Sequence, residues 1–169
     1  MLFEIPLWFA PFFYQIDLSE VPVMIGAFAL GPLAGILIEL VKIIIKLVII
    51  PTKTGFVGEL ANFILGYTFV VPAALIYKLK KTKKSAYVGL GVGTLFLAVA
   101  GSFVNAYILL PLYSKTMIPM DEIIAMGTEV NGLIKSMRDL IIYAVIPFNL
   151  LKGILVSLIV SLLYKKTAF

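Results

Sequence analysis

The chain has 169 residues, of which 62% are hydrophobic and 14% are charged, and its formal net charge is +5. Soluble globular domains carry charges on about a quarter of their residues, so this composition excludes that class and favours an integral membrane protein. The chain has no cysteine and no histidine. Disulfides, thiol and imidazole chemistry and the usual zinc sites are therefore excluded. The length allows about six membrane helices of ~20 residues each, in a single domain covering residues 1–169.

The lysines are concentrated just after two apolar runs. They lie at Lys78, Lys80, Lys81, Lys83 and Lys84, and again at Lys165 and Lys166. Because loops rich in lysine stay on the cytoplasmic side of a membrane, we expect the 78–84 loop and the C-terminus to be cytoplasmic. Basic residues gathered in this way do not indicate a nucleic-acid partner.

The first apolar run, residues 1–13, predicts an incomplete helix. Thirteen residues make only ~20 Å of helix, which is too short for a hydrocarbon core of ~30 Å. Pro6 and Pro11 shorten it further, so we expect either a protein that starts upstream of Met1 or a first helix that is incomplete. The run is not typical of a signal peptide, because it lacks a basic start and a small-residue cleavage site.

Helix-starting and helix-breaking residues indicate where the remaining helices begin and end. Helix-start residues from Asp17 to Glu20 predict a short helix at 19–30, which Gly31-Pro32 ends. The further predicted helices cover 33–50, 57–77, 87–112 and 140–164. Alternation then places the loops 14–18, 51–56 and 113–138 outside the cell. Apolar residues recur at helical spacing within 119–137, which indicates either a helix covering a binding site or an ordinary surface helix.

Polar side chains gather near the predicted outside ends of these helices. Asn149 and Lys152 share one face of the last helix. A lysine inside a span costs ~2.5–3.5 kcal/mol on insertion scales, so it needs an interior cavity or a partner. The pair therefore indicates hydrogen bonding to a ligand rich in amide or imide groups. The alternative is a lysine neutralised by a structural carboxylate, either Glu59 or Glu39.

Other polar residues have both structural and functional interpretations. Asn105 ends a stripe of small residues, Gly89, Gly93 and Gly101, that favours close helix packing; the asparagine itself either joins helices or lines a site. Lys46 either reaches the membrane interface or contacts a ligand, whereas Glu39 and Lys42 neutralise each other as an i,i+3 pair. The outside stretch richest in candidate binding residues runs from Thr54 to Asn62 and includes Gly55 and Glu59.

Four segments in chain order resemble a known family. They are Asp17–Pro22 (DLSEVP), Gly31–Gly35 (GPLAG), Gly58–Gly66 (GELANFILG) and Ile146–Gly153 (IPFNLLKG). With this topology, the chain resembles the riboflavin-binding S components of energy-coupling factor (ECF) vitamin transporters. The resemblance covers nearly the whole chain, and its most specific part is the Pro-Phe-Asn-x-x-Lys-Gly segment.

The resemblance implies an all-α bundle of six membrane helices that binds riboflavin, as a transported substrate and not a cofactor, at the extracellular side. It implies that Asn105, Asn149 and Lys152 contact the flavin ring and that Lys53, Thr54 and Gly55 add contacts. The ribityl hydroxyls then need polar partners, for which Glu59 and Asn62 are at hand. The implied partners are a membrane coupling subunit and two cytoplasmic ATPases, since the chain has no phosphate-binding loop of its own. The family's Ala-x-x-x-Ala docking pattern is missing before Pro11.

Three other functions remain open at this stage. The first is an S component for another vitamin or for a flavin nucleotide, whose phosphate would use extra basic groups. The second is a small membrane enzyme, although clustered aspartates for a metal and a histidine base are both missing. The third is a purely structural membrane subunit, which leaves the one-sided polar cluster without an explanation.

Overall fold

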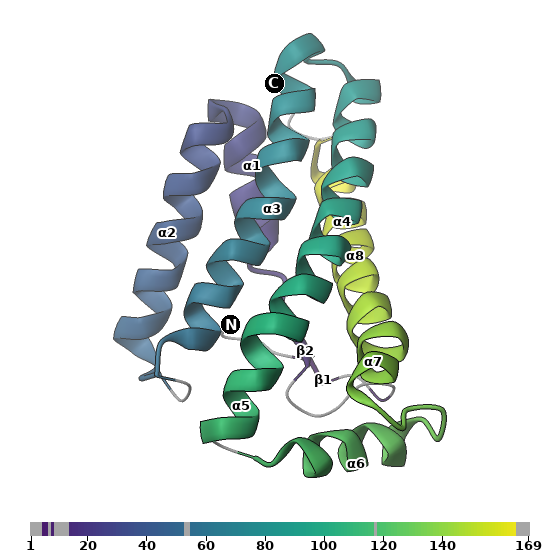
Figure 1. The fold of residues 1–169 in the computed structure, drawn as a ribbon. Coiled ribbons are helices and arrows are strands. Elements are labelled where there is room, and N and C mark those ends of the chain that lie inside the picture. Colours follow the sequence, from purple (N-terminus) through teal and green to yellow (C-terminus); the bar gives the residue numbers. More distant parts are fainter. Residues whose placement is uncertain (1–4, 7, 9–13, 53–54, 117, 165–169) are drawn as a thin grey trace.

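The computed structural model describes residues 5–6, 8, 14–52, 55–116 and 118–164. Helices dominate these residues (Figure 1). In chain order the elements are β1 (Ile5–Pro6), β2 (Gln15–Ile16), α1 (Glu20–Leu30), α2 (Pro32–Ile49), α3 (Val57–Lys80), α4 (Lys83–Val104), η1 (Asn105–Leu109), α5 (Leu110–Thr116), α6 (Met120–Val130), α7 (Met137–Leu140), η2 (Ile141–Val145) and α8 (Ile146–Tyr164).

Three continuous helices in the described residues are long and apolar enough to cross a membrane: Val57–Lys80, Lys83–Thr116 and Met137–Tyr164. The second of these joins α4, η1 and α5, and the third joins α7, η2 and α8. Helix α2 has 18 apolar-rich residues but carries three charges, at Glu39, Lys42 and Lys46. The expected all-helical membrane fold is confirmed, and for the five helices predicted from residue 19 onward the limits differ from the observed ones by at most four residues.

The loops alternate between the two ends of the bundle (Figure 1). The α1–α2 and α3–α4 turns lie at the upper end, and the α2–α3 loop, α6 and α7 lie at the lower end. Gly31, with φ +101°, makes the turn between α1 and α2, a conformation that a side chain would strain. The chain therefore doubles back tightly at Gly31-Pro32, as the sequence predicts.

The core lies where α1, α3, α4 and α8 meet. Phe69 and Met24 are fully buried there. A Cβ added at Gly89 would lie 2.5 Å from the carbonyl oxygen of Ala73, and one at Gly93 would lie 2.5 Å from that of Phe69. Both glycines thus allow α4 to pack against the backbone of α3, which is the packing role predicted for the small-residue stripe.

Each of the two π-helical turns comes just before a proline. Turn η1 precedes Leu110-Pro111, and η2 precedes Ile146-Pro147. A proline offers no N–H to the carbonyl four residues earlier and its ring clashes there, so the helix widens by one residue upstream. The two π-turns contact one another. The α-helical hydrogen-bond pattern of the two long helices is therefore interrupted at neighbouring positions in the bundle.

At the N-terminal end, the described residues do not continue a helix. Ile5–Pro6 pairs antiparallel with Gln15–Ile16 as two-residue strands. Proline lacks the donor that a helix interior requires, so Pro6 accounts for extended backbone in place of the predicted helix at this position. Most of the predicted 1–13 run lies outside the described residues.

The predicted helix within 119–137 is observed as α6. Its buried Ile123 packs with Leu110, Leu140 and Ala144 at the ends of the two long helices. A Cβ added at Gly127 would lie 2.9 Å from Ile134, so α6 is held closely by the chain that follows it. Helix α6 is therefore packed onto the lower end of the bundle.

Candidate functional site

Asn105 and Asn149 lie on either side of Gly101 in α4. The amide nitrogen of Asn105 donates to the Gly101 carbonyl at 2.8 Å, and a Cβ added at Gly101 would lie 2.4 Å from Nδ2 of Asn149. Asn149 in turn donates to the Val145 carbonyl, the last of η2, at 2.9 Å. Both side chains are almost fully buried. Two asparagines predicted separately from the sequence are thus brought into one place by the π-turns and a glycine.

Tyr14 completes this group, and the sequence analysis missed it. Its hydroxyl donates to Oδ1 of Asn105 at 2.7 Å, and its ring packs against Phe148 with centroids 5.2 Å apart. The contact joins residues 91 positions apart in the chain. A buried tyrosine commonly finds a hydrogen-bond partner, but no local pattern indicates which residue that partner is.

Lys152 lies 3.7 Å from Oε1 of Glu20, measured from its ammonium nitrogen, and both side chains are at least nine-tenths buried. The sequence predicted Glu59 or Glu39 as the alternative neutralising partner, and both predictions are wrong. The reason is tertiary: α1 packs against both α8 and α2, which places the first residue of α1 beside Lys152.

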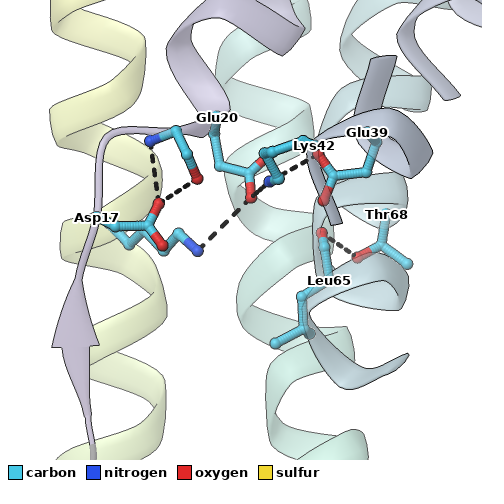
Figure 2. Close-up of polar contacts among 8 residues, drawn as sticks. Asp17, Glu20, Glu39, Lys42, Leu65 and Thr68 are labelled. Atoms are coloured by element: carbon cyan, nitrogen blue, oxygen red, sulfur yellow. Dashed lines mark hydrogen bonds and ion pairs between the residues drawn. The ribbon is translucent and has the colours of Figure 1, made fainter. Parts of the chain in front are cut away.

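Glu20 is shared with a second lysine. Oε1 of Glu20 accepts from Lys42 at 2.8 Å, and Lys42 also pairs with Glu39 at 2.8 Å. Figure 2 shows Lys42 between the two carboxylates. The predicted Glu39–Lys42 pair is therefore confirmed, within a larger network. Beside it, Asp17 accepts from the Ser19 backbone at 3.0 Å, ahead of α1.

Two of the predicted ligand contacts near the α2–α3 loop are paired with each other. Lys46 forms an ion pair and hydrogen bond with Glu59, whose other oxygen accepts from Thr52 at 2.9 Å. Lys46 thus reaches a carboxylate of α3 in this structure. Asn62 is half-buried on the same helix.

Gly55 is exposed and left-handed, with φ +57°, and a Cβ there would meet nothing within 4 Å. Lys53 and Thr54 lie outside the described residues. The predicted residues of this loop therefore contribute only Gly55 to the described geometry.

The combined site offers two amides, a tyrosine hydroxyl and an ammonium group whose charge is balanced by a neighbouring carboxylate. Amides both donate and accept, whereas an ammonium only donates. Such a set suits an uncharged polar ligand with carbonyl and imide groups. Among the described residues no cluster of three or more histidine, cysteine or acidic side chains could hold a metal ion.

A membrane-embedded helical bundle with these polar groups in its interior belongs to the class of small-molecule-binding membrane proteins. The chain is a member of the substrate-specific components of ECF transporters, because the model of that family matches residues 1–164. Members of this family are transport subunits and not enzymes.

Individual relatives agree with this membership. The riboflavin transporter RibU of Staphylococcus aureus (strain TCH60) is 33% identical over 98% of this chain and 80% of its own length. The riboflavin transporter FmnP of Bacillus subtilis (strain 168) is 30% identical over 98% of this chain and 83% of its own length. A solved structure described as the S component of a bacterial ECF transporter superposes with a TM-score of 0.74 at 32% identity, covering 98% of this chain and 84% of that one.

Proposed function

We propose that this chain captures riboflavin for uptake across the cell membrane. The observation that carries the proposal is the burial of Asn105 and Asn149 beside Gly101, with Lys152 buried three residues further along α8, in a chain that matches the ECF S-component family. The two relatives named above are both riboflavin transporters. A vitamin bound by these three side chains accounts for polar groups that would otherwise be costly within a membrane bundle.

The flavin ring has the matching chemistry. Its carbonyl oxygens and ring nitrogens accept hydrogen bonds, and its imide N–H donates one. Asn105 and Asn149 each use one amide hydrogen on a helix carbonyl, which leaves a second hydrogen on each nitrogen for the ring. Lys152 adds a charged donor, and hydrogen bonds to charged groups are worth ~1.5–3 kcal/mol. The three residues thus match both the acceptors and the imide of the ring.

The ribityl chain of the vitamin then extends toward the α2–α3 loop. In this proposal Glu59, Asn62 and Lys46 contact its hydroxyls, with Lys53, Thr54 and Gly55 adding contacts from the loop. Support comes from the place of α3, which begins at the same lower end of the bundle as β2, α6 and α7 (Figure 1). The Lys46–Glu59 pair would open or share its hydrogen bonds on binding.

The proposed orientation places that lower end outside the cell. The lysines of the 78–84 segment lie at the opposite end, around the α3–α4 turn (Figure 1), which suits the cytoplasmic side. Energy is supplied by a membrane coupling subunit and two cytoplasmic ATPases, which act with the S component to release the vitamin inside.

The first experiment is an absorbance spectrum of the detergent-purified protein, followed by riboflavin titration monitored by flavin fluorescence. We expect saturable quenching at about one flavin per chain. Asn149→Ala and Lys152→Ala should each lose most of this binding while the protein still inserts and purifies. Glu122→Gln, on the exposed face of α6, is the control. Wild-type binding in both site variants would contradict the site assignment, and binding of another vitamin alone would contradict the ligand.

A further inference from the structure

Glu20 connects the lysine of the candidate site to a second buried lysine on another helix. We propose that Glu20 is a positioning residue for the ligand: it keeps the Lys152 ammonium charged and directed into the site, without touching riboflavin itself. This inference rests on the function proposed above. It adds a residue that the sequence analysis did not select for binding.

The two lysines interact with the Glu20 carboxylate at different distances. Lys42 lies 2.8 Å from Oε1 of Glu20, a hydrogen bond, whereas Lys152 lies 3.7 Å from the same oxygen. At 3.7 Å the attraction between the charges persists, but a hydrogen bond is not formed. Glu20 therefore stabilises the charge on Lys152 without taking any of its three ammonium donors in a hydrogen bond.

The position of Glu20 is fixed from its other side. Lys42 pairs with Glu39 as well as with Glu20, and a Cβ added at Gly66 of α3 would lie 2.3 Å from Oε1 of Glu39. Charges therefore alternate from Lys152 on α8 through Glu20 on α1 to Lys42 and Glu39 on α2, and the far end rests against α3. Figure 2 shows the α1 and α2 part of this series.

These residues also lie at one depth in the bundle. Glu20 begins α1, whose 11 residues extend ~16 Å from the Gly31 turn. Lys42 lies ten residues into α2 after the same turn, or ~15 Å. At that depth a lone ammonium group is costly in an apolar surrounding. Lys152 also lies within electrostatic range of the buried carboxylate of Asp17. Without Glu20, Asp17 would be its remaining counter-charge, and an ammonium group drawn toward Asp17 would bond the ligand more weakly.

A double-mutant cycle on riboflavin affinity tests whether Glu20 acts through Lys152. The variants are Glu20→Gln, Lys152→Gln and the double variant. We expect Glu20→Gln to weaken binding about tenfold, the size of one charge-assisted hydrogen bond, and to weaken it no further when Lys152 is already glutamine. Additive losses, or wild-type affinity in Glu20→Gln, would overturn the proposal, because independent sites add their effects.

Two further readouts separate positioning from a general structural role. The absorbance band of bound riboflavin in Glu20→Gln should move toward its position in Lys152→Gln, because both variants lose the same cation beside the ring. Glu20→Asp, which keeps the charge, should recover part of the lost affinity, and it replaces Glu20→Gln in the cycle if that variant does not fold. An unmoved band, or no recovery with aspartate, would contradict the inference.

Measuring riboflavin binding by the wild-type protein in parallel distinguishes a failure of the proposed function from a failure of the role of Glu20. A wild-type protein that ignores riboflavin would refute the proposed function together with this inference. A wild-type protein that binds riboflavin, combined with an additive cycle, would refute only the role of Glu20.

Discussion

Substituting Gly101 with alanine should displace the Asn149 side chain while leaving all the proposed ligand-binding residues unchanged in the sequence. The added Cβ would lie 2.4 Å from Nδ2, 2.7 Å from Cγ and 3.0 Å from Oδ1 of Asn149. Non-bonded heavy atoms are most stable at ~3.5–4.0 Å, so the amide has to withdraw by about 1 Å. Gly101 does not have a positive φ, so alanine fits the backbone itself, and the clash with Asn149 is the whole perturbation.

The magnitude follows from the hydrogen bonds that the displaced amide can no longer make. Each polar group left unsatisfied in a buried site costs ~1–3 kcal/mol. Losing the donor and the acceptor of Asn149 together therefore costs ~2–6 kcal/mol of binding free energy, or a rise in the riboflavin Kd of about thirtyfold to more than ten-thousandfold. The fold itself should lose only ~1–3 kcal/mol, as expected when a methyl group is added to a packed interior.

The assay is flavin-fluorescence titration of the detergent-purified variant beside Gly91→Ala. Gly91 lies on the same helix, α4, but a Cβ there would meet nothing within 4 Å. Gly91→Ala should bind riboflavin as the wild type does and should be equally or slightly more stable, because alanine favours helices over glycine by up to ~1 kcal/mol. Unchanged affinity in Gly101→Ala, or an equal loss in both variants, would refute the placement of Asn149 in the site.

The remaining predictions concern stability, measured as thermal melting in detergent without ligand. Lys42→Met should lower stability by ~3–5 kcal/mol, because it leaves the buried carboxylates of Glu20 and Glu39 without their shared cation; a melting temperature equal to that of the wild type would contradict the network. Tyr14→Phe should cost ~0.5–1.5 kcal/mol, since Oδ1 of Asn105 loses its donor. An unchanged melting temperature for Tyr14→Phe would show that another donor replaces the hydroxyl.

The sequence indicated the class of protein and most of the helix limits because lipid leaves the chain few alternatives. Every backbone polar group within the bilayer must be satisfied internally, so a long apolar run has to form a helix. Glycine and proline together favour the ends of such helices. Gly31-Pro32 ends α1 for this reason, and Pro51 follows the end of α2. A polar side chain within a membrane span also costs free energy, so it is usually paired or functional. Asn105, Asn149 and Lys152 could therefore be recognised in the sequence as candidate site residues.

The local sequence pattern was less informative at the two prolines that follow π-helical turns, Pro111 and Pro147. Pro147 lies inside the predicted 140–164 helix, and the observed helix begins at Met137 and accommodates the proline through η2. The observed π-turn keeps the helix continuous and turns Asn149 toward Gly101. A proline shows that the ordinary hydrogen-bond ladder must change, but the packing around it decides between a break and a wider turn.

The partners of the polar residues were decided only by tertiary structure. Sequence spacing identified the Glu39–Lys42 pair, since both residues lie on one helix. It could not identify Glu20 as the partner of Lys152 or Tyr14 as the donor to Asn105, because each contact joins segments distant in the chain. Periodicity determines which face of a helix is polar. The neighbour that this face meets depends on how α1 lies between α2 and α8, and that arrangement results from the packing of all the helices together.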